Sequence, residues 1–348
     1  MTSSTRPPTR DQLLACIDRF SGTEVLVIAD LVLDAFEYGT IGRISREAPV
    51  LILDHVRTDY LPGGGANAAC NLAFLEGQAL LVGRVGDDEE GRILVGLLRE
   101  RGIDTSGIWR DSQFRTPVKR RILGGSAQSV KQQLVRIDSG GGPAVDPGDA
   151  PLLATLRDLR PRAAGALISD YSLGLFHAGT ITPVLKALST GHTTLFADSR
   201  RQLPAFHGLT AATPNLPEAE EALDDAIGDD FGRLERGGAA LRKKLDAEAI
   251  LLTRGSRGMS LFTRDDEPVH LPVYGTDEVA DVTGAGDTVI GVFCLGRLSG
   301  SSFLEAAILS NYAGGIVVMK RGTACVSLDE LREAVRTDPE FGRGPARP

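Results

Sequence analysis

The sequence has no long apolar run, no excess of basic residues and few cysteines. A membrane-spanning helix needs about 20 consecutive apolar residues, and no stretch of this chain provides them. The first residues, MTSSTRPPTRDQ, also lack the apolar core of a secretory signal. These absences predict a cytoplasmic protein with no membrane partner.

Basic side chains are the minority, with 38 Lys and Arg against 46 Asp and Glu and a net charge of −8. Because proteins that bind nucleic acid usually carry a basic face, we expect no nucleic-acid partner. The four cysteines and five histidines lack the spacing of metal ligands, which predicts reduced core thiols. Neither a Walker P-loop nor a G-x-G-x-x-G between a strand and a helix is present, which counts against both of those nucleotide-binding classes.

What the chain does contain is a regular alternation of strand-like and helix-like segments. With 42% hydrophobic residues in 348, it can bury a sizeable core. Such alternation predicts an α/β fold, with a mostly parallel central sheet and helices on both faces. The predicted strands are 24–30, 78–86, 165–171, 193–199 and 249–253, and the predicted helices include 11–20, 66–76, 89–101 and 288–295.

Two segments, 48–64 and 116–138, break this alternation. Each is predicted as a pair of strands with a turn, and together they predict a small β-sheet that covers a site at the strands' carboxyl ends. The exposed edges of this lid also predict a homodimer that pairs through it. The expected limits are 11–335 for the main domain, about 36–62 and 112–138 for the lid, and 336–348 for a tail.

The stretch DVTGAGDT places Gly284, Ala285, Gly286 and Asp287 where an extended segment becomes an apolar helix. The first N–H groups of a helix have no intrahelical acceptor and lie at the positive end of its dipole, so they attract an anion. Asp287 beside such an anion could act as a general base. A plain helix cap with glycines for close packing accounts for the tetrapeptide about equally well.

Three other stretches have both a structural and a functional interpretation. PGGGANAACN is either a flexible loop before a helix or a ligand cradle with Gly64 and Asn67. In TPNLPEAE, Asn215 and Glu218 fit a capping box, or a carboxylate that holds water on Mg²⁺. TRGSRGMSLF is either a hairpin turn or a nest for phosphates.

Taken in order, PGGGANAA, TPNLPE, TRGSRG and DVTGAGDT resemble the PfkB, or ribokinase-like, family of carbohydrate kinases along nearly the whole chain. Within that family, YGTIGRISREAPV, QQLVRID and SDYSLG are similar to the kinases of D-glycero-β-D-manno-heptose 7-phosphate. The resemblance implies transfer of the γ-phosphoryl group of ATP to a sugar or sugar-phosphate hydroxyl, with Mg²⁺ and possible use of K⁺. Kinases of another sugar or a nucleoside, and a sugar-binding relative without turnover, are the alternatives.

The resemblance also implies a role for each matching residue. Asp287 would deprotonate the acceptor, and the N–H groups of Gly284, Ala285 and Gly286 would hold the transferred phosphoryl group. For the nucleotide and Mg²⁺ it implies Asn215, Glu218, Thr253, Gly255 and Gly258. For the sugar it implies Asp30, Gly64, Asn67 and Asp170, and for a monovalent cation Asp281 and Thr283.

The basic residues of the lid also bear on the acceptor. Lys119 and Arg136 are candidates for binding an acceptor's phosphate, although a charged edge strand is also a common guard against aggregation. The chain departs from the heptose kinases at Ala35, Glu37 and Leu173, which all lie near the expected acceptor site. These departures leave a different sugar or sugar phosphate as a second interpretation.

Overall fold

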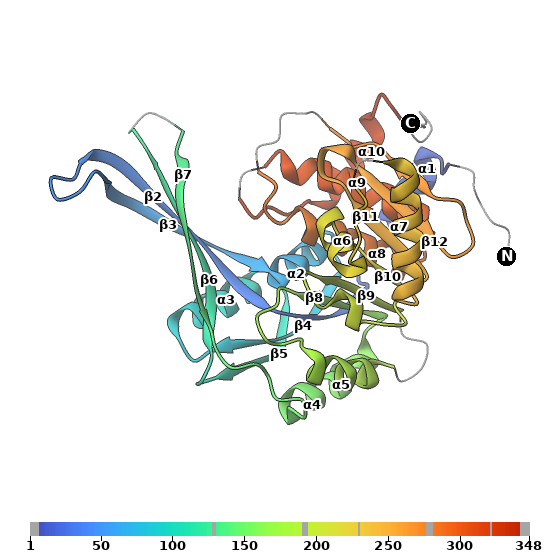
Figure 1. The fold of residues 1–348 in the computed structure, drawn as a ribbon, viewed down its shortest axis with the longest axis horizontal. Coiled ribbons are helices and arrows are strands. Elements are labelled where there is room, and N and C mark those ends of the chain that lie inside the picture. Colours follow the sequence, from blue (N-terminus) through green and yellow to red (C-terminus); the bar gives the residue numbers. More distant parts are fainter. Residues whose placement is uncertain are drawn as a thin grey trace.

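The computed structural model describes residues 7–126, 130–189, 194–228, 230–275, 281–320 and 322–341. Within them, one large sheet and one small sheet form, and helices cover both faces of the large one (Figure 1). The helices are α1 (Arg10–Ile17), α2 (Gly65–Phe74), α3 (Glu89–Glu100), α4 (Ala150–Leu159), α5 (Ala178–Leu188), α6 (Leu216–Leu223), α7 (Phe231–Lys244), α8 (Ala285–Leu298), α9 (Phe303–Val318) and α10 (Leu328–Thr337).

The described strands of the large sheet run in the order β13-β12-β11-β10-β9-β8-β1-β4-β5. All neighbours are parallel except at one edge, where β12 pairs antiparallel with both β11 and β13. This confirms the α/β fold with a mostly parallel sheet. The strands are β1 (Glu24–Ala29), β4 (Gln78–Gly86), β5 (Asp104–Asp111), β8 (Gly165–Asp170), β9 (Thr194–Ser199), β10 (Ala211–Ala212), β11 (Ala249–Thr253), β12 (Met259–Thr263) and β13 (Val269–Leu271).

The apolar side chains of β1 alternate between two cores, as a strand buried on both faces requires. Val25 and Val27 pack into a core with α1, α2, α3, α8, α9 and α10. Leu26 and Ile28 pack into the core on the opposite face, with α4, α5, α6 and α7. Two helical layers therefore hold the central strands rigidly, and the carboxyl ends of those strands form a fixed edge.

The small sheet contains β2 (Leu31–Ile44), β3 (Leu51–Gly64), β6 (Arg115–Gly125) and β7 (Gln132–Gly141), in the order β3-β2-β6-β7. Figure 1 shows these long strands leaving the main body together. The second predicted pair is the β6–β7 hairpin. The first prediction was wrong in detail, because 51–64 is one unbroken strand whose partner, β2, precedes it.

The root of the small sheet lies beside the carboxyl ends of the central strands. One residue, Asp30, separates β1 from β2, so the chain passes directly from the main sheet into the lid. Several apolar side chains of the lid are exposed. They are Ile44, Val50, Leu51, Val56, Val130, Leu134, Val135 and Ile137.

The last described residues pack against α9. In the predicted tail 336–348, the carboxylate of Asp338 accepts a hydrogen bond from the hydroxyl of Tyr312 at 2.6 Å. Residues 342–348 lie outside the described part. None of the helices described here has both the length and the apolar character that a bilayer crossing demands.

Candidate active site

A cavity of about 310 Å³ lies between the lid root, the carboxyl ends of β8 and β9, and the N-terminus of α8. Its wall includes charged side chains of both signs and three glycines. The residues that line it are Asp34, Gly64, Lys119, Arg121, Arg136, Asp170, Tyr171, Asp198, Arg200, Thr213, Asn215, Glu218, Thr253, Val282, Thr283, Gly284, Gly286, Asp287 and Thr323.

The N-terminus of α8 forms one wall of the cavity. Gly284 is its N-cap, with φ of +80°, and a Cβ there would lie 2.5 Å from Nδ2 of Asn67. At Gly286 a Cβ would meet nothing within 4 Å, so this glycine leaves space open. The Ala285 N–H donates to the carbonyl of Val282 at 3.2 Å. Of the three N–H groups predicted for an anion, that of Ala285 thus has an acceptor in the chain, while helix geometry leaves those of Gly286 and the following Asp287 without an intrahelical one.

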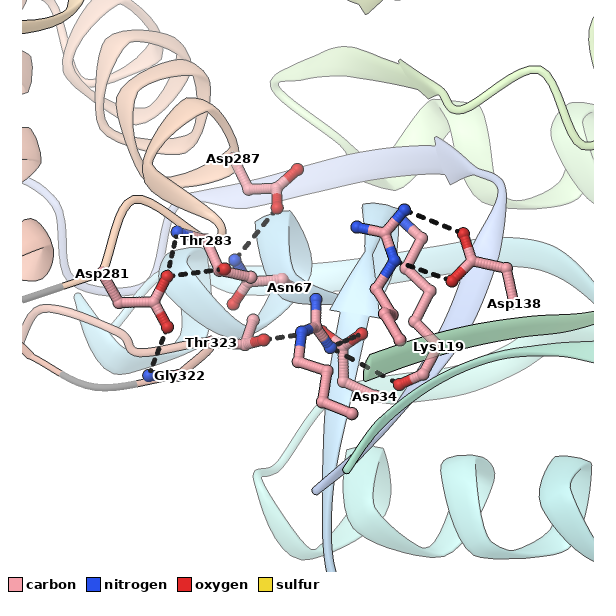
Figure 2. A network of polar contacts seen from close by, with 11 residues as sticks. Asp34, Asn67, Lys119, Asp138, Asp281, Thr283, Asp287, Gly322 and Thr323 are labelled. Carbon is pink, nitrogen blue, oxygen red and sulfur yellow. Dashed lines mark hydrogen bonds and ion pairs between the residues drawn. The ribbon is translucent and has the colours of Figure 1, made fainter. Parts of the chain in front are cut away.

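Asp287 is buried, and its carboxylate is held by two donors. Nδ2 of Asn67 donates to Oδ2 at 3.0 Å, and the hydroxyl of Tyr171 donates to Oδ1 at 2.7 Å. Figure 2 shows Asn67 reaching Asp287 from the neighbouring helix. Burial raises the pKa of Asp287 to about 6, while these two hydrogen bonds and the charge of Lys119 oppose the rise. A carboxyl group with this pKa can accept a proton near neutral pH.

Two acids at the lid root have different surroundings. Asp30, the predicted sugar residue, accepts hydrogen bonds from the N–H groups of Tyr171 and Leu173 at 2.9 Å each, and burial raises its pKa to about 7. It is not among the described residues that line the cavity. Asp34 does line it, and there accepts from Arg121 at 2.7 Å and from Thr323 at 2.6 Å.

The other residues predicted for the sugar lie nearby. Gly64 lines the cavity with φ of +56°, and Asp170 lines it while its carboxylate accepts from the hydroxyl of Ser199 at 2.6 Å. Burial raises the pKa of Asp170. Asn67 lies behind Asp287 and contacts it directly. The site therefore gathers acids that can accept hydrogen bonds from hydroxyls.

Cationic side chains face these acids. Lys119 is half-buried with its Nζ 4.8 Å from the ring centroid of Tyr171, and burial followed by the charge of Arg200 lowers its pKa. Arg200 lies 4.4 Å from the same centroid. Arg136 is half-exposed and pairs with Asp138 at 2.8 Å (Figure 2). Arg200 lines the cavity but was not among the residues predicted for the site.

The predicted nucleotide residues divide into two groups. Asn215 and Glu218 form the capping box of α6, with reciprocal bonds of 2.9 Å, and both line the cavity together with Thr253. Gly255 and Gly258 are not among the described residues of the cavity wall. They have φ of +58° and +79° in the turn between β11 and β12, and a Cβ on Gly258 would lie 2.0 Å from a backbone oxygen.

The residues predicted for a monovalent cation lie before α8. Oδ1 of Asp281 accepts from the N–H and the hydroxyl of Thr283 at 2.9 and 2.7 Å, and Oδ2 accepts from the N–H of Gly322 at 3.1 Å (Figure 2). Hydrogen bonds from these donors keep the pKa of Asp281 low although burial raises it. Asp281 thus joins the turn before α8 to the loop that follows α9.

An acidic pair on the wall fits a divalent cation. Burial and the charge of Glu218 raise the pKa of Asp198 well above its usual value, and burial also raises the pKa of Glu218. A bound cation would relieve this repulsion. No set of three or more His, Cys, Asp or Glu in the described ranges could hold a metal unaided. The pair therefore fits Mg²⁺, which takes much of its coordination from phosphates and water.

The pfkB family carbohydrate kinase model matches residues 24–132 and 185–330. The family match, together with the ribokinase-like α/β fold, defines a phosphotransferase with a hydroxyl acceptor. The chain belongs to this family of carbohydrate kinases.

Curated relatives agree with this assignment. The chain is 37% identical over 326 residues to the "Bifunctional protein HldE" of Edwardsiella ictaluri, covering 93% of this chain and 66% of the relative. It is 40% identical over 326 residues to the protein of the same name from Methylococcus capsulatus, with the same coverage. The chain therefore spans about two thirds of the length of these relatives.

Solved structures show the same fold. Ribokinase of Arabidopsis thaliana, complexed with ribose and ATP, superposes with a TM-score of 0.69 at 18% identity, covering 91% of this chain and all of the other, 100%. Phosphofructokinase-2 of Escherichia coli, in complex with substrates and products, gives 0.70 at 17% identity, covering 90% and 98%. The same enzyme has also been solved in complex with potassium.

Proposed function

We propose that this kinase transfers the γ-phosphoryl group of ATP to D-glycero-β-D-manno-heptose 7-phosphate and makes the 1,7-bisphosphate. The observation that carries the proposal is that Lys119, Arg136 and Arg200 line the same cavity as Asp287. An acceptor that already bears a phosphate needs cationic groups at a distance from the reacting hydroxyl. The similarity to HldE proteins supports this acceptor over a free sugar.

The residues of the cavity suggest how the reaction proceeds. Asp34 and Asp170 would hold acceptor hydroxyls, and Asp287 would take the proton of the attacking hydroxyl. The N–H groups of Gly286 and Asp287 would stabilise the charge on the transferred phosphoryl group. Phosphoryl transfer depends mainly on such positioning and charge stabilisation.

The opposite wall suits the nucleotide. Asn215, Thr253 and Glu218 would lie beside the ATP phosphates, with Mg²⁺ held through Glu218 and Asp198. When bound, Mg²⁺ neutralises phosphate charge during the transfer. A monovalent cation such as K⁺ near Asp281 and Thr283 remains a proposal that the sequence resemblance suggests.

A panel of phosphoryl acceptors tests the proposed substrate. The purified protein with Mg·ATP is expected to phosphorylate the heptose 7-phosphate with a far higher kcat/KM than ribose, fructose, adenosine or an unphosphorylated heptose. Production of ADP is measured with each acceptor at matched concentrations. Preference for an unphosphorylated sugar or a nucleoside would overturn the acceptor and leave the carbohydrate kinase class intact.

Removing the charge of Lys119 or Arg136, the two lid residues proposed to bind the acceptor's phosphate, should weaken acceptor binding. Lys119→Ala and Arg136→Ala are each expected to raise the acceptor KM roughly tenfold, with little change in the KM for ATP, because a charge-assisted contact to phosphate is lost. The matched control is Arg57→Ala, since Arg57 also lies in the lid and pairs with an acid two residues later, Asp59. Unchanged acceptor KM values in both cavity variants would remove the phosphate-binding role.

Activity should require Mg²⁺ and depend on Glu218. Glu218→Gln is expected to raise the Mg²⁺ concentration needed for half-maximal rate, because a neutral amide holds the ion's water shell less well. Glu305→Gln is the control, since Glu305 closes an equivalent capping box with Ser302 at the start of α9. If the metal titrations of both variants overlay that of the parent, Glu218 acts only as a cap.

The lid also suggests the oligomeric state that we propose. Val56, Val135 and Ile137 are at least 49% exposed on its strands, and burial of such side chains against a second copy would be favourable. A homodimer is therefore expected by sedimentation, and Val56→Lys together with Ile137→Lys should shift it to monomer. A parent that sediments as a monomer at micromolar concentration would contradict pairing through the lid.

A further inference from the structure

A tyrosine outside the sequence motifs for ATP and the phosphoryl group contacts the carboxylate of Asp287. Tyr171 follows β8, and its hydroxyl donates to Oδ1 of Asp287 at 2.7 Å. Asn67 donates to the other oxygen, Oδ2, at 3.0 Å. Because the two donors come from different elements and take different oxygens, together they fix the rotation of the carboxylate about its Cβ–Cγ bond.

The loop that presents Tyr171 is itself held firmly. Oδ2 of Asp30 accepts the N–H groups of both Tyr171 and Leu173 at 2.9 Å. Between them, Ser172 has φ of +59°, a conformation that residues other than glycine rarely adopt. The Ser172 N–H donates to Oδ1 of Asp170 at 2.7 Å. The buried Asp30 thus fixes the backbone from which Tyr171 reaches the base.

The ring of Tyr171 is also in contact with the cations of the cavity. Lys119 and Arg200 lie 4.8 and 4.4 Å from its centroid. Burial, followed by the charge of Asp287, raises the pKa of the Tyr171 hydroxyl well above its usual value. The hydroxyl therefore stays protonated at all working pH values and acts only as a donor to the carboxylate.

We propose that Tyr171 is a positioning residue for phosphoryl transfer, whose hydroxyl holds the carboxylate of Asp287 oriented and ionised for proton abstraction from the acceptor. The inference rests on the proposed role of Asp287 as the base. It extends that role to a residue whose ring also contacts Lys119 and Arg200, the cations proposed for the acceptor's phosphate.

The groups that face Asp287 determine in which direction its pKa moves when the Tyr171 hydroxyl is removed. Lys119 of β6 and the donors Asn67 and Tyr171 favour the ionised carboxylate, while burial and the charge of Asp34 from β2 oppose it. Asp198 at the end of β9 also repels it. Loss of the tyrosine hydroxyl removes one favourable interaction, so the pKa of Asp287 rises further above about 6.

The test is the pH dependence of kcat/KM in Tyr171→Phe. The acid limb of the profile is expected to move up by about one pH unit, so that activity falls roughly fivefold near pH 6, close to tenfold at about pH 5, and recovers largely by pH 8. The KM for ATP should not change. Tyr312→Phe is the matched control. The Tyr312 hydroxyl donates to the carboxylate of Asp338 at 2.6 Å, and neither residue lines the cavity, so the pH profile of this variant should match that of the parent.

A second variant keeps the ring and the hydroxyl, and so guards against a folding defect. Fluorotyrosine at position 171 is a stronger donor, so it should move the acid limb down instead of up. A parent-like limb in both variants would overturn the role of Tyr171. That outcome differs from failure of the proposed base, which would appear as near-normal turnover in Asp287→Asn.

Discussion

Asp287→Asn is expected to lower kcat by roughly 10²–10⁴-fold, the usual contribution of a general base, and to leave ATP binding largely intact. The amide cannot take the proton of the attacking hydroxyl. It can still accept a hydrogen bond from Asn67 or Tyr171, so the cavity should keep its shape. Steady-state kinetics give kcat, and the affinity for ATP is measured separately by equilibrium binding.

The parent enzyme's pH profile adds an independent check. Because burial raises the pKa of Asp287 to about 6, the fraction of ionised base falls as the pH drops through that value. Activity should therefore decrease below about pH 6 and reach a plateau above it, and Asp287→Asn should lose this limb. Near-normal turnover in the variant would show that Asp287 is only part of a helix cap.

Gly286→Ala is expected to produce the second large effect, a loss of roughly 10²–10³-fold in kcat, because a methyl group there would keep the developing anion from the N–H groups of the helix start, at a cost like that of removing one donor. Apart from its chain neighbours and the backbone of its own helix, the new methyl group would meet no atom within 4 Å, so it would project into the space where an anion would approach the helix N-terminus. The fold should not suffer, since alanine stabilises a helix by about 0.5–1 kcal/mol over glycine.

Gly96→Ala is the matched control for this substitution. Gly96 lies within α3, and a Cβ there also meets nothing within 4 Å. Both variants should therefore melt at or above the temperature of the parent, and only Gly286→Ala should lose activity. If Gly286→Ala retains full turnover, the N-terminus of α8 does not hold the transferred phosphoryl group.

Those parts of the site that depend on local geometry were predictable from sequence. The start of α8 at DVTGAGDT was predictable because a positive φ at Gly284 and an acid in the first turn are local features. The capping box of Asn215 and Glu218 was predictable for the same reason. The alternation of strands and helices likewise predicted the parallel sheet, because it follows from hydrophobic pattern alone.

The remaining parts depend on contacts between distant segments. Tyr171, Arg200 and Thr323 line one cavity, but no spacing in the sequence connects them. The same holds for Asp34, which lines the cavity although Asp30, and not Asp34, was predicted for the sugar. Both acids follow the same buried strand, and only the path of the chain into β2 decides that Asp34 lines the cavity while Asp30 binds a backbone loop.

The position of Asp34 has a thermodynamic consequence for the two substrates. Its carboxylate joins Arg121 of the lid to Thr323, and the adjacent Gly322 binds Asp281 at the turn before α8 (Figure 2). These hydrogen bonds, joined by the peptide bond between Gly322 and Thr323, connect the side proposed for the acceptor with the side proposed for the phosphates. A ligand that shifts one end of this connection changes the binding free energy of the ligand at the other end, and such linkage is reciprocal. The factor by which the acceptor changes the dissociation constant of ATP must equal the factor by which ATP changes that of the acceptor.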